Sequence, residues 1–244
     1  QVLRASLLIL VFLILADYIF NYQNVSNEIN MRRLWNPARE QSIPTWFSAM
    51  LAHALAITVF LIAWIQAPRQ PRWATVFWVL TGLFFLFIGI DDFASIHEKL
   101  GRAVSNIARR NEIGMPSVIL EDATFSFFAL VAPLYAMCGM LILAFLGASF
   151  MKQGILHLLF LGFGLWAVSQ SLDLVFGTEF LRANIPWIME TFNVEHKYGV
   201  THTVKVTEES LEMLGTIVLW YGFLKYFTRV SDGFELRLES ARTD

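Results

Sequence analysis

Residues 43–92 decide the fold of this chain, because they contain two long apolar runs separated by a short proline-rich turn. The first run, residues 43–66, reads IPTWFSAMLAHALAITVFLIAWIQ, and the second, residues 73–92, reads WATVFWVLTGLFFLFIGIDD. Pro68 and Pro71 bracket the turn, and proline interrupts a helix because it lacks the N–H donor. A bilayer core needs about 20 apolar residues per helix, so the segment predicts two antiparallel membrane-spanning helices.

Four more apolar runs lie outside this segment, and the composition also indicates a membrane protein. Of the 244 residues, 56% are hydrophobic and 16% are charged. A soluble domain has about 25% charged residues. We therefore expect an all-α bundle of six transmembrane helices, the other four spanning residues 3–20, 117–148, 154–176 and 204–226. In this interpretation residues 1–230 form one transmembrane domain, and residues 231–244 form a short polar C-terminal tail.

An even number of spans places both termini on the same side of the membrane. The 18 Lys and Arg residues divide almost evenly between the two sides, but the loops on the side of the termini are short and nearly free of acid. We therefore expect both termini to be cytoplasmic, since cytoplasmic loops are usually rich in Lys and Arg. The net charge of −2 and the lack of a basic run exclude a nucleic-acid partner and leave membrane lipids as the expected surroundings.

Ionisable residues gather at the end of the predicted bundle that lies opposite the termini. They close the first, third and fifth runs, open the fourth and sixth, and include a histidine in the second. Charged groups at membrane depth are expensive, so such a cluster indicates a functional site. The residues concerned are Asp17, His53, Asp91, Asp92, His97, Glu98, Glu121, Asp122, Asp173, His202, Glu208, Glu209 and Glu212.

Helical spacing orders some of these residues into stripes. Thr201, Lys205, Glu208 and Glu212 fall on one face of the sixth helix, and His202 and Glu209 form a neighbouring stripe. In the third helix, which we expect to continue to about Gly101, Asp91, Ser95 and Glu98 share a face. His97 would point away from that face unless the end of the helix bends.

Two kinds of site suit these residues. Imidazole and carboxylate ligands together favour a divalent zinc, iron or manganese ion. The candidate metal ligands are His53, His97, His202, Asp92, Asp173, Glu208 and Glu209, and the candidate catalytic carboxylates are Asp91 and Glu212. The other kind is a carboxylate-rich site or proton relay built from Asp17, Asp91, Asp173, Glu208 and Glu212 and closed by Lys205.

Some of the same residues also have a purely structural interpretation. Glu208 and Glu209 would lie near the start of the sixth helix, where the helix dipole stabilises carboxylates and Lys205 can pair with either of them. His53 alone would be a hydrogen-bonded core histidine. Four other acids differ, because they lie near helix C-termini, where the dipole disfavours anions, and so they require a cation, which could be Lys99, Arg102 or a metal. These acids are Asp91, Asp92, Glu98 and Asp173.

Three motifs resemble an uncharacterised family of bacterial polytopic membrane proteins. They are IPTWFS at residues 43–48, DDFASIHE at residues 91–98 and EESLEMLG at residues 208–215. The chain departs from the family pattern at Asp92, where glutamate is expected. The resemblance covers most of the predicted membrane domain and implies the six-helix architecture and a bacterial inner membrane, but no activity.

The chain is also similar, by analogy, to the alkaline ceramidase and adiponectin-receptor superfamily. These are membrane hydrolases with a three-histidine zinc site. The chain has the residue types of that site but lacks the paired histidines of the last helix, and it has one predicted span fewer.

Three functions therefore remain open from the sequence. The leading one is an integral membrane protein with an acidic and histidine-containing ion site near the non-cytoplasmic face, in its sharpest form a metal-dependent hydrolase of a lipid-like substrate. In that form a carboxylate such as Asp91 or Glu212 would be the general base. The alternative is a non-catalytic accessory subunit of a larger membrane complex, with other membrane subunits as partners. The third is a proton- or ion-coupled transporter.

Overall fold

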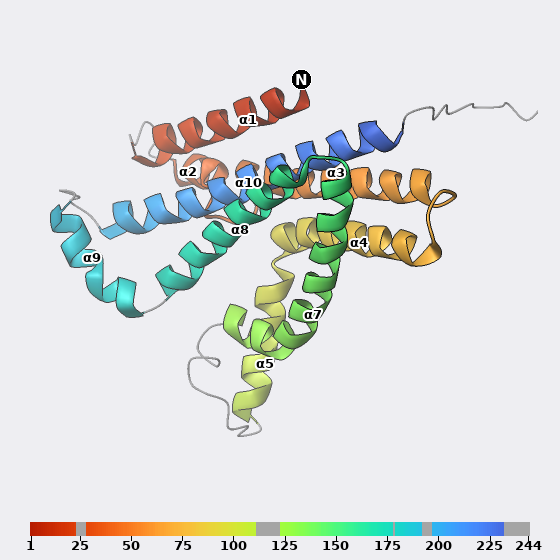
Figure 1. The fold of residues 1–244 in the computed structure, drawn as a ribbon. Coiled ribbons are helices and arrows are strands. Elements are labelled where there is room, and N and C mark those ends of the chain that lie inside the picture. Colours follow the sequence, from red (N-terminus) through yellow and green to blue (C-terminus); the bar gives the residue numbers. More distant parts are fainter. Residues whose placement is uncertain (23–27, 111–122, 178, 192–196, 232–244) are drawn as a thin grey trace, which may run out of the picture.

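The computed structural model describes the chain except for residues 23–27, 111–122, 178, 192–196 and 232–244 (Figure 1). Every regular element in the described ranges is a helix. In chain order these are α1 (Val2–Asp17) with the π-helical turn η1 (Tyr18–Tyr22), α2 (Ile29–Trp35), α3 (Ile43–Gln66), α4 (Arg72–Ala94), α5 (Ile96–Arg110), α7 (Ala123–Lys152), α8 (Leu156–Gly177), α9 (Glu179–Thr191) and α10 (Lys197–Val230).

Helices α3 and α4 form the antiparallel pair that the opening stretch of sequence predicts (Figure 1). Ser42 precedes α3, and its hydroxyl accepts a hydrogen bond from the Thr45 backbone N–H at 3.2 Å. This cap satisfies one of the backbone donors that are left without a partner at a helix start, and Pro44 fits the first turn because it has no N–H to satisfy. The boundaries of this pair are therefore set locally.

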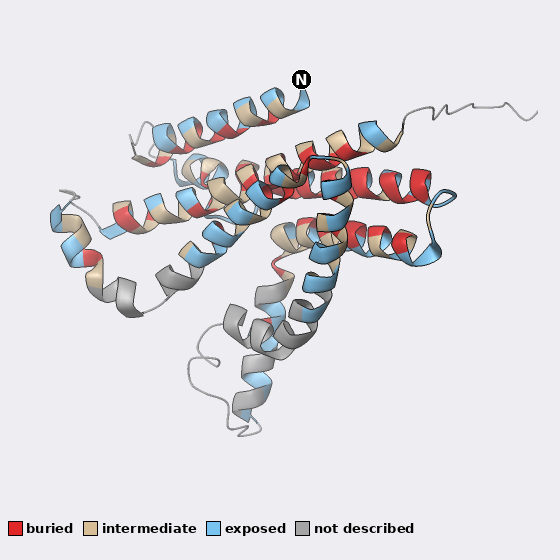
Figure 2. Cartoon of the chain, viewed as in Figure 1, coloured by how far each residue is buried: buried red, intermediate tan, exposed pale blue. Residues whose placement is uncertain are grey.

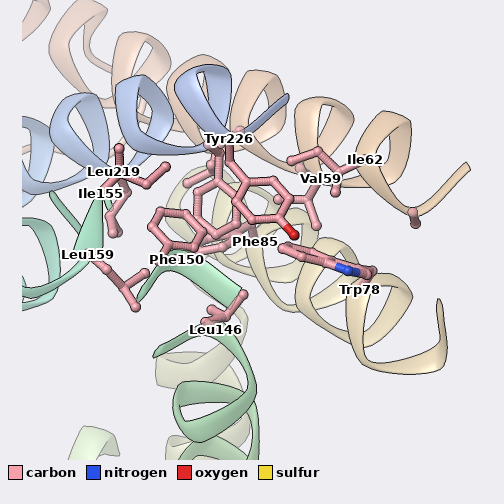
Figure 3. Packing of buried hydrophobic residues seen from close by; sticks show 14 residues of the cluster. Val59, Ile62, Trp78, Phe85, Leu146, Phe150, Ile155, Leu159, Leu219 and Tyr226 are labelled. Atoms are coloured by element: carbon pink, nitrogen blue, oxygen red, sulfur yellow. The ribbon is translucent and has the colours of Figure 1, made fainter. Parts of the chain in front are cut away.

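The main core lies where α3, α4, α8, α10 and the end of α7 meet. Trp78, Phe85, Phe150 and Phe223 are fully buried there. Phe223 makes edge-to-face contacts, with ring centroids 4.9 Å from Phe150 and 5.7 Å from Phe85, an arrangement that aromatic quadrupoles favour. Figure 3 shows Trp78, Phe85 and Phe150 close to Tyr226 and Val59, so aromatic packing joins α3, α4, α7 and α10.

Two glycines let α8 and α10 approach each other closely. A Cβ atom added to Gly215 would lie 2.9 Å from the Gly162 carbonyl oxygen and 2.5 Å from Cδ1 of Trp166. Small residues at helix crossings are a common way to bring membrane helices together, because dispersion contacts and interhelical hydrogen bonds replace the hydrophobic effect there. The spacing between α8 and α10 therefore depends on Gly162 and Gly215.

Among the described residues, three helical segments are long and apolar enough to cross a membrane: Val2–Tyr22, Ile43–Gln66 and Arg72–Ala94. Gly139–Lys152 and Leu156–Leu172 are apolar but shorter. Large apolar side chains such as Leu8 and Phe160 are about 70% and 69% exposed, and exposed positions run along α1 and α8 in Figure 2. The structure is thus that of a helical protein with three candidate spans, and the full set of six spans stays a prediction.

The region after α4 differs from the expectation of one helix running to Gly101. Ser95 ends α4 in the left-handed conformation, with φ 48° and ψ 47°, and its N–H donates to the Asp91 carbonyl at 2.6 Å. A left-handed residue is a common helix ending and changes the chain direction. The next helix, α5, lies beside α7 as a pair that projects from the rest of the molecule in Figure 1.

Segments expected to be loops also contain helices. Helix α2 lies between the first and second predicted spans, and α9 lies between the fifth and sixth and includes Pro186. The last helix, α10, begins at Lys197, seven residues before the predicted start at residue 204. This early start changes how the acidic residues of α10 are interpreted.

We expect Gly215→Ala to lower the thermal stability of the purified protein, because the added methyl group meets the Gly162 backbone. Overpacking of this kind costs about 1–3 kcal/mol of unfolding free energy. Gly164→Ala in α8 is the matched control, since a Cβ there has nothing within 4 Å and alanine favours a helix. Equal melting temperatures for the two variants would contradict the close approach.

Candidate functional site

Three glutamates of α10 lie well inside the helix. Glu208, Glu209 and Glu212 follow Lys197, the first residue of α10, by more than ten residues. The favourable effect of a helix dipole on an anion falls off within the first turn. The helix start therefore does not explain these three carboxylates, contrary to the structural interpretation of Glu208 and Glu209.

A fourth carboxylate joins them from α4. The charged groups that act on the Glu209 carboxyl are Glu212, Asp92 and Glu208, with Lys205 acting in the opposite sense. Glu208 is buried, whereas Asp92, Glu209 and Glu212 are half-buried. We call Asp92, Glu208, Glu209 and Glu212 the acidic cluster; it brings the end of α4 and the middle of α10 within electrostatic range.

Lys205 lies against the buried member of the acidic cluster. Its Nζ is 3.0 Å from Oε1 and 2.9 Å from Oε2 of Glu208. The lysine side chain is about 41% exposed and the glutamate side chain 7%, so the lysine is the more solvent-exposed partner of the pair. This ion pair balances one of the four carboxylates.

Helix α8 fixes the backbone beneath the acidic cluster. Ser169 Oγ donates to the Glu208 carbonyl at 2.9 Å. Trp166 Nε1 donates to the Glu212 carbonyl at 3.0 Å and lies 3.1 Å from Thr216 Oγ1. Both bonds cross the interface that Gly162 and Gly215 bring together, so the position of the glutamates along α10 is held from α8.

His202 belongs to a second buried group. Its Nε2 donates to both carboxylate oxygens of Asp17 at 3.1 Å, and Asp17 is 1% exposed. Asn21 Nδ2 donates to Asp17 Oδ1 at 2.9 Å, and Tyr198 stacks on the His202 ring with centroids 5.1 Å apart. This Asp17–His202 pair ties η1 and the end of α1 to α10.

His53 lies beside α4, one turn from Asp92. Its Nδ1 donates to the Ala49 carbonyl at 2.6 Å, and a Cβ on Gly89 would lie 2.5 Å from that nitrogen. A backbone bond at Nδ1 fixes the ring orientation and makes Nε2 the acceptor or ligand nitrogen of the neutral form. Gly89 precedes Asp92 by three residues, so the His53 imidazole packs against α4 about one helical turn from Asp92.

The remaining predicted site residues are placed as follows. Asp91 is half-buried in the last turn of α4. The side chains of His97, Glu98 and Asp173, and residues Glu121 and Asp122, lie outside the described part of the chain. In the part that is described, no group of three or more His, Cys, Asp or Glu side chains has a geometry suited to a metal ion.

Several residues of the site were not singled out from the sequence. Asn21 follows Asp17 by four residues, and Tyr198 precedes His202 by four, so helical spacing could have indicated both contacts. Trp166 had no comparable signal, because an interior tryptophan in an apolar run is most simply explained by packing. Its bond to the Glu212 carbonyl depends on how α8 and α10 cross.

Comparison with known proteins gives one family match. A family model described as a domain of unknown function, DUF8692, matches residues 5–227. No curated protein and no solved structure matches the chain.

We expect His202→Ala to lower the melting temperature clearly, because it leaves the buried Asp17 carboxylate without the imidazole donor. A buried acceptor that loses its partner costs about 1–3 kcal/mol, and more when it is charged. His157→Ala is the control, since His157 is exposed on α8. If both histidine variants melt at the wild-type temperature, the Asp17–His202 pair does not stabilise the fold.

Proposed function

Because the chain belongs to the DUF8692 family, whose description assigns no activity, we propose a function from its acidic residues: an integral membrane protein that binds a divalent metal ion at the acidic cluster. The observation that carries this proposal is that Asp92, Glu208 and Glu212 lie within electrostatic range of Glu209. The three candidate spans support the membrane setting.

Electrostatics gives the physical reason for a cation. Glu212, Asp92 and Glu208 act on the Glu209 carboxyl as like charges, and Lys205 acts in the opposite sense. Two like charges 4 Å apart repel by about 4 kcal/mol at the effective dielectric of a protein surface, and burial increases the repulsion. A bound cation relieves this repulsion, and carboxylates in an apolar setting are otherwise expensive to keep.

The donor set indicates the class of metal. Carboxylate oxygens suit magnesium, calcium and manganese, whereas an added imidazole extends the range to zinc and iron. His53 packs against Gly89, one turn of α4 from Asp92, and its Nε2 is the candidate nitrogen ligand. We therefore place manganese, zinc and iron first, with Asp92, Glu208 and Glu209 as ligands.

In its catalytic form the proposal is a metal-dependent hydrolase of a lipid-like substrate. The metal would activate water for the reaction. Glu212, on α10, and Asp91, on α4, are the two carboxylates that we assign to accept the proton of that water. A substrate from the bilayer would approach along the exposed apolar faces of the candidate spans.

The test is metal analysis and titration calorimetry on detergent-purified protein. We expect a stoichiometric metal ion in the wild type, and weakening of manganese or zinc binding by about tenfold or more in Glu209→Gln and Glu212→Gln. Glutamine keeps the shape of the side chain and removes its charge. Glu190→Gln is the control, because Glu190 is an exposed glutamate of α9, and it should bind like the wild type.

Two outcomes would contradict this proposal. One is the absence of bound metal together with variants that bind added metal as the wild type does. The other is a large loss of stability in Glu212→Gln with normal metal content, which would make the acidic cluster an internal salt-bridge network, as the accessory-subunit alternative requires.

A further inference from the structure

The opposite end of the molecule from the acidic cluster contains a cavity of about 290 Å³. It is lined by Gln66, Arg69, Gln70, Arg229 and Val230, from the end of α3, the turn after it and the end of α10. This cavity takes no part in the metal-site proposal, and we call it the arginine pocket.

The described residues that line the arginine pocket include two arginines and no acid. The first acidic residue after Arg229 in the chain, Asp232, lies outside the described residues. Arg69 donates one hydrogen bond, at 3.1 Å, to the Val230 carbonyl, which leaves most of its five donors for another partner. The Arg229 guanidinium lies beside the turn between α7 and α8, 3.9 Å from a Cβ position on Gly154.

Two glutamines add polar groups to the same wall. Gln66 is 5% exposed, and its Nε2 donates to Tyr226 Oη at 2.9 Å, which holds the side chain in place. Gln70 Oε1 is buried and has no hydrogen-bond partner among the described residues. Buried polar atoms are normally hydrogen-bonded, so a hydroxyl on the bound molecule would satisfy this acceptor.

The position of the arginine pocket matches a membrane interface. Arg229 follows Glu209 by 20 residues of α10, which is about 30 Å along the helix axis and equals the thickness of a bilayer core. Trp64 and Trp73, at the end of α3 and the start of α4, are 56% and 60% exposed on either side of the turn. Exposed tryptophans are typical of the headgroup level.

We propose that the arginine pocket binds a phosphate group that carries a hydroxyl-bearing substituent. Guanidinium groups bind phosphate oxygens with paired, charge-assisted hydrogen bonds, and basic pockets between membrane helices recognise anionic lipid headgroups. A glycerol phosphate headgroup has both the anion for Arg69 and Arg229 and the hydroxyl for Gln70. The same chemistry occurs in soluble glycerol phosphate, and the experiment separates the two sources.

The experiment measures thermal stability of the detergent-purified full chain with three additions: phosphatidylglycerol, phosphatidylcholine and soluble glycerol phosphate. We expect saturable stabilisation by phosphatidylglycerol, none by phosphatidylcholine, and at least a tenfold higher half-saturating concentration in Arg229→Gln. Stabilisation by soluble glycerol phosphate alone would assign the pocket to a free ligand and keep the phosphate chemistry.

Arg72→Gln is the matched control, because Arg72 is an exposed arginine at the same end and does not line the pocket. It should respond to phosphatidylglycerol like the wild type. Arg229→Lys provides a second test if Arg229→Gln does not fold, since it keeps the charge but removes the paired guanidinium donors, and it should also raise the half-saturating concentration of phosphatidylglycerol. Equal effects of Arg72→Gln and Arg229→Gln, or no response to either phosphate compound, would overturn the proposal.

Discussion

The close approach of α8 and α10 at Gly162 and Gly215 is the constraint on which the rest of the structure depends. It allows Trp166 and Ser169 to reach backbone carbonyls of α10. In an apolar setting, hydrogen bonds and dispersion contacts have to replace the hydrophobic effect between helices. The glutamates of α10 therefore keep a fixed position relative to α8, while packing of α10 on α3 relates them to α4.

Helix α10 connects the three polar features of the molecule. Its first part carries His202, which bonds to Asp17 of α1, and its middle carries Glu208, Glu209 and Glu212. Its C-terminal end carries Arg229 of the arginine pocket. The acids and the arginine are separated by about the thickness of a bilayer core, so one helix would place a cation site and an anion site at opposite faces.

The sequence predicts the parts of this fold that are set locally. The α3–α4 pair follows from Ser42, Pro44 and the prolines of the turn, and the structure has both helices where they were expected. The membrane character and the all-helical class follow from composition. The bend at Ser95 could not be predicted from the sequence, because the left-handed conformation of this serine depends on how the helices on either side of it pack.

Which residues of the site contact one another was harder to predict than which residues belong to the site. Asp92, Glu208, Glu209 and Glu212 were all named from the sequence, and the structure has them within electrostatic range of one another. His202 was named with them, but it bonds to Asp17 instead, because α1 packs on the first part of α10. Helical phase orders residues within one helix and says nothing about which neighbouring helix they face.

The most direct measurement of the central claim is anomalous X-ray scattering from crystals of the protein grown with manganese. We expect a single strong peak within coordination distance of carboxylate oxygens of Asp92, Glu208 or Glu209. The account is contradicted if manganese occupies other positions only, while the carboxylates of the acidic cluster contact Lys205, other cationic side chains or each other.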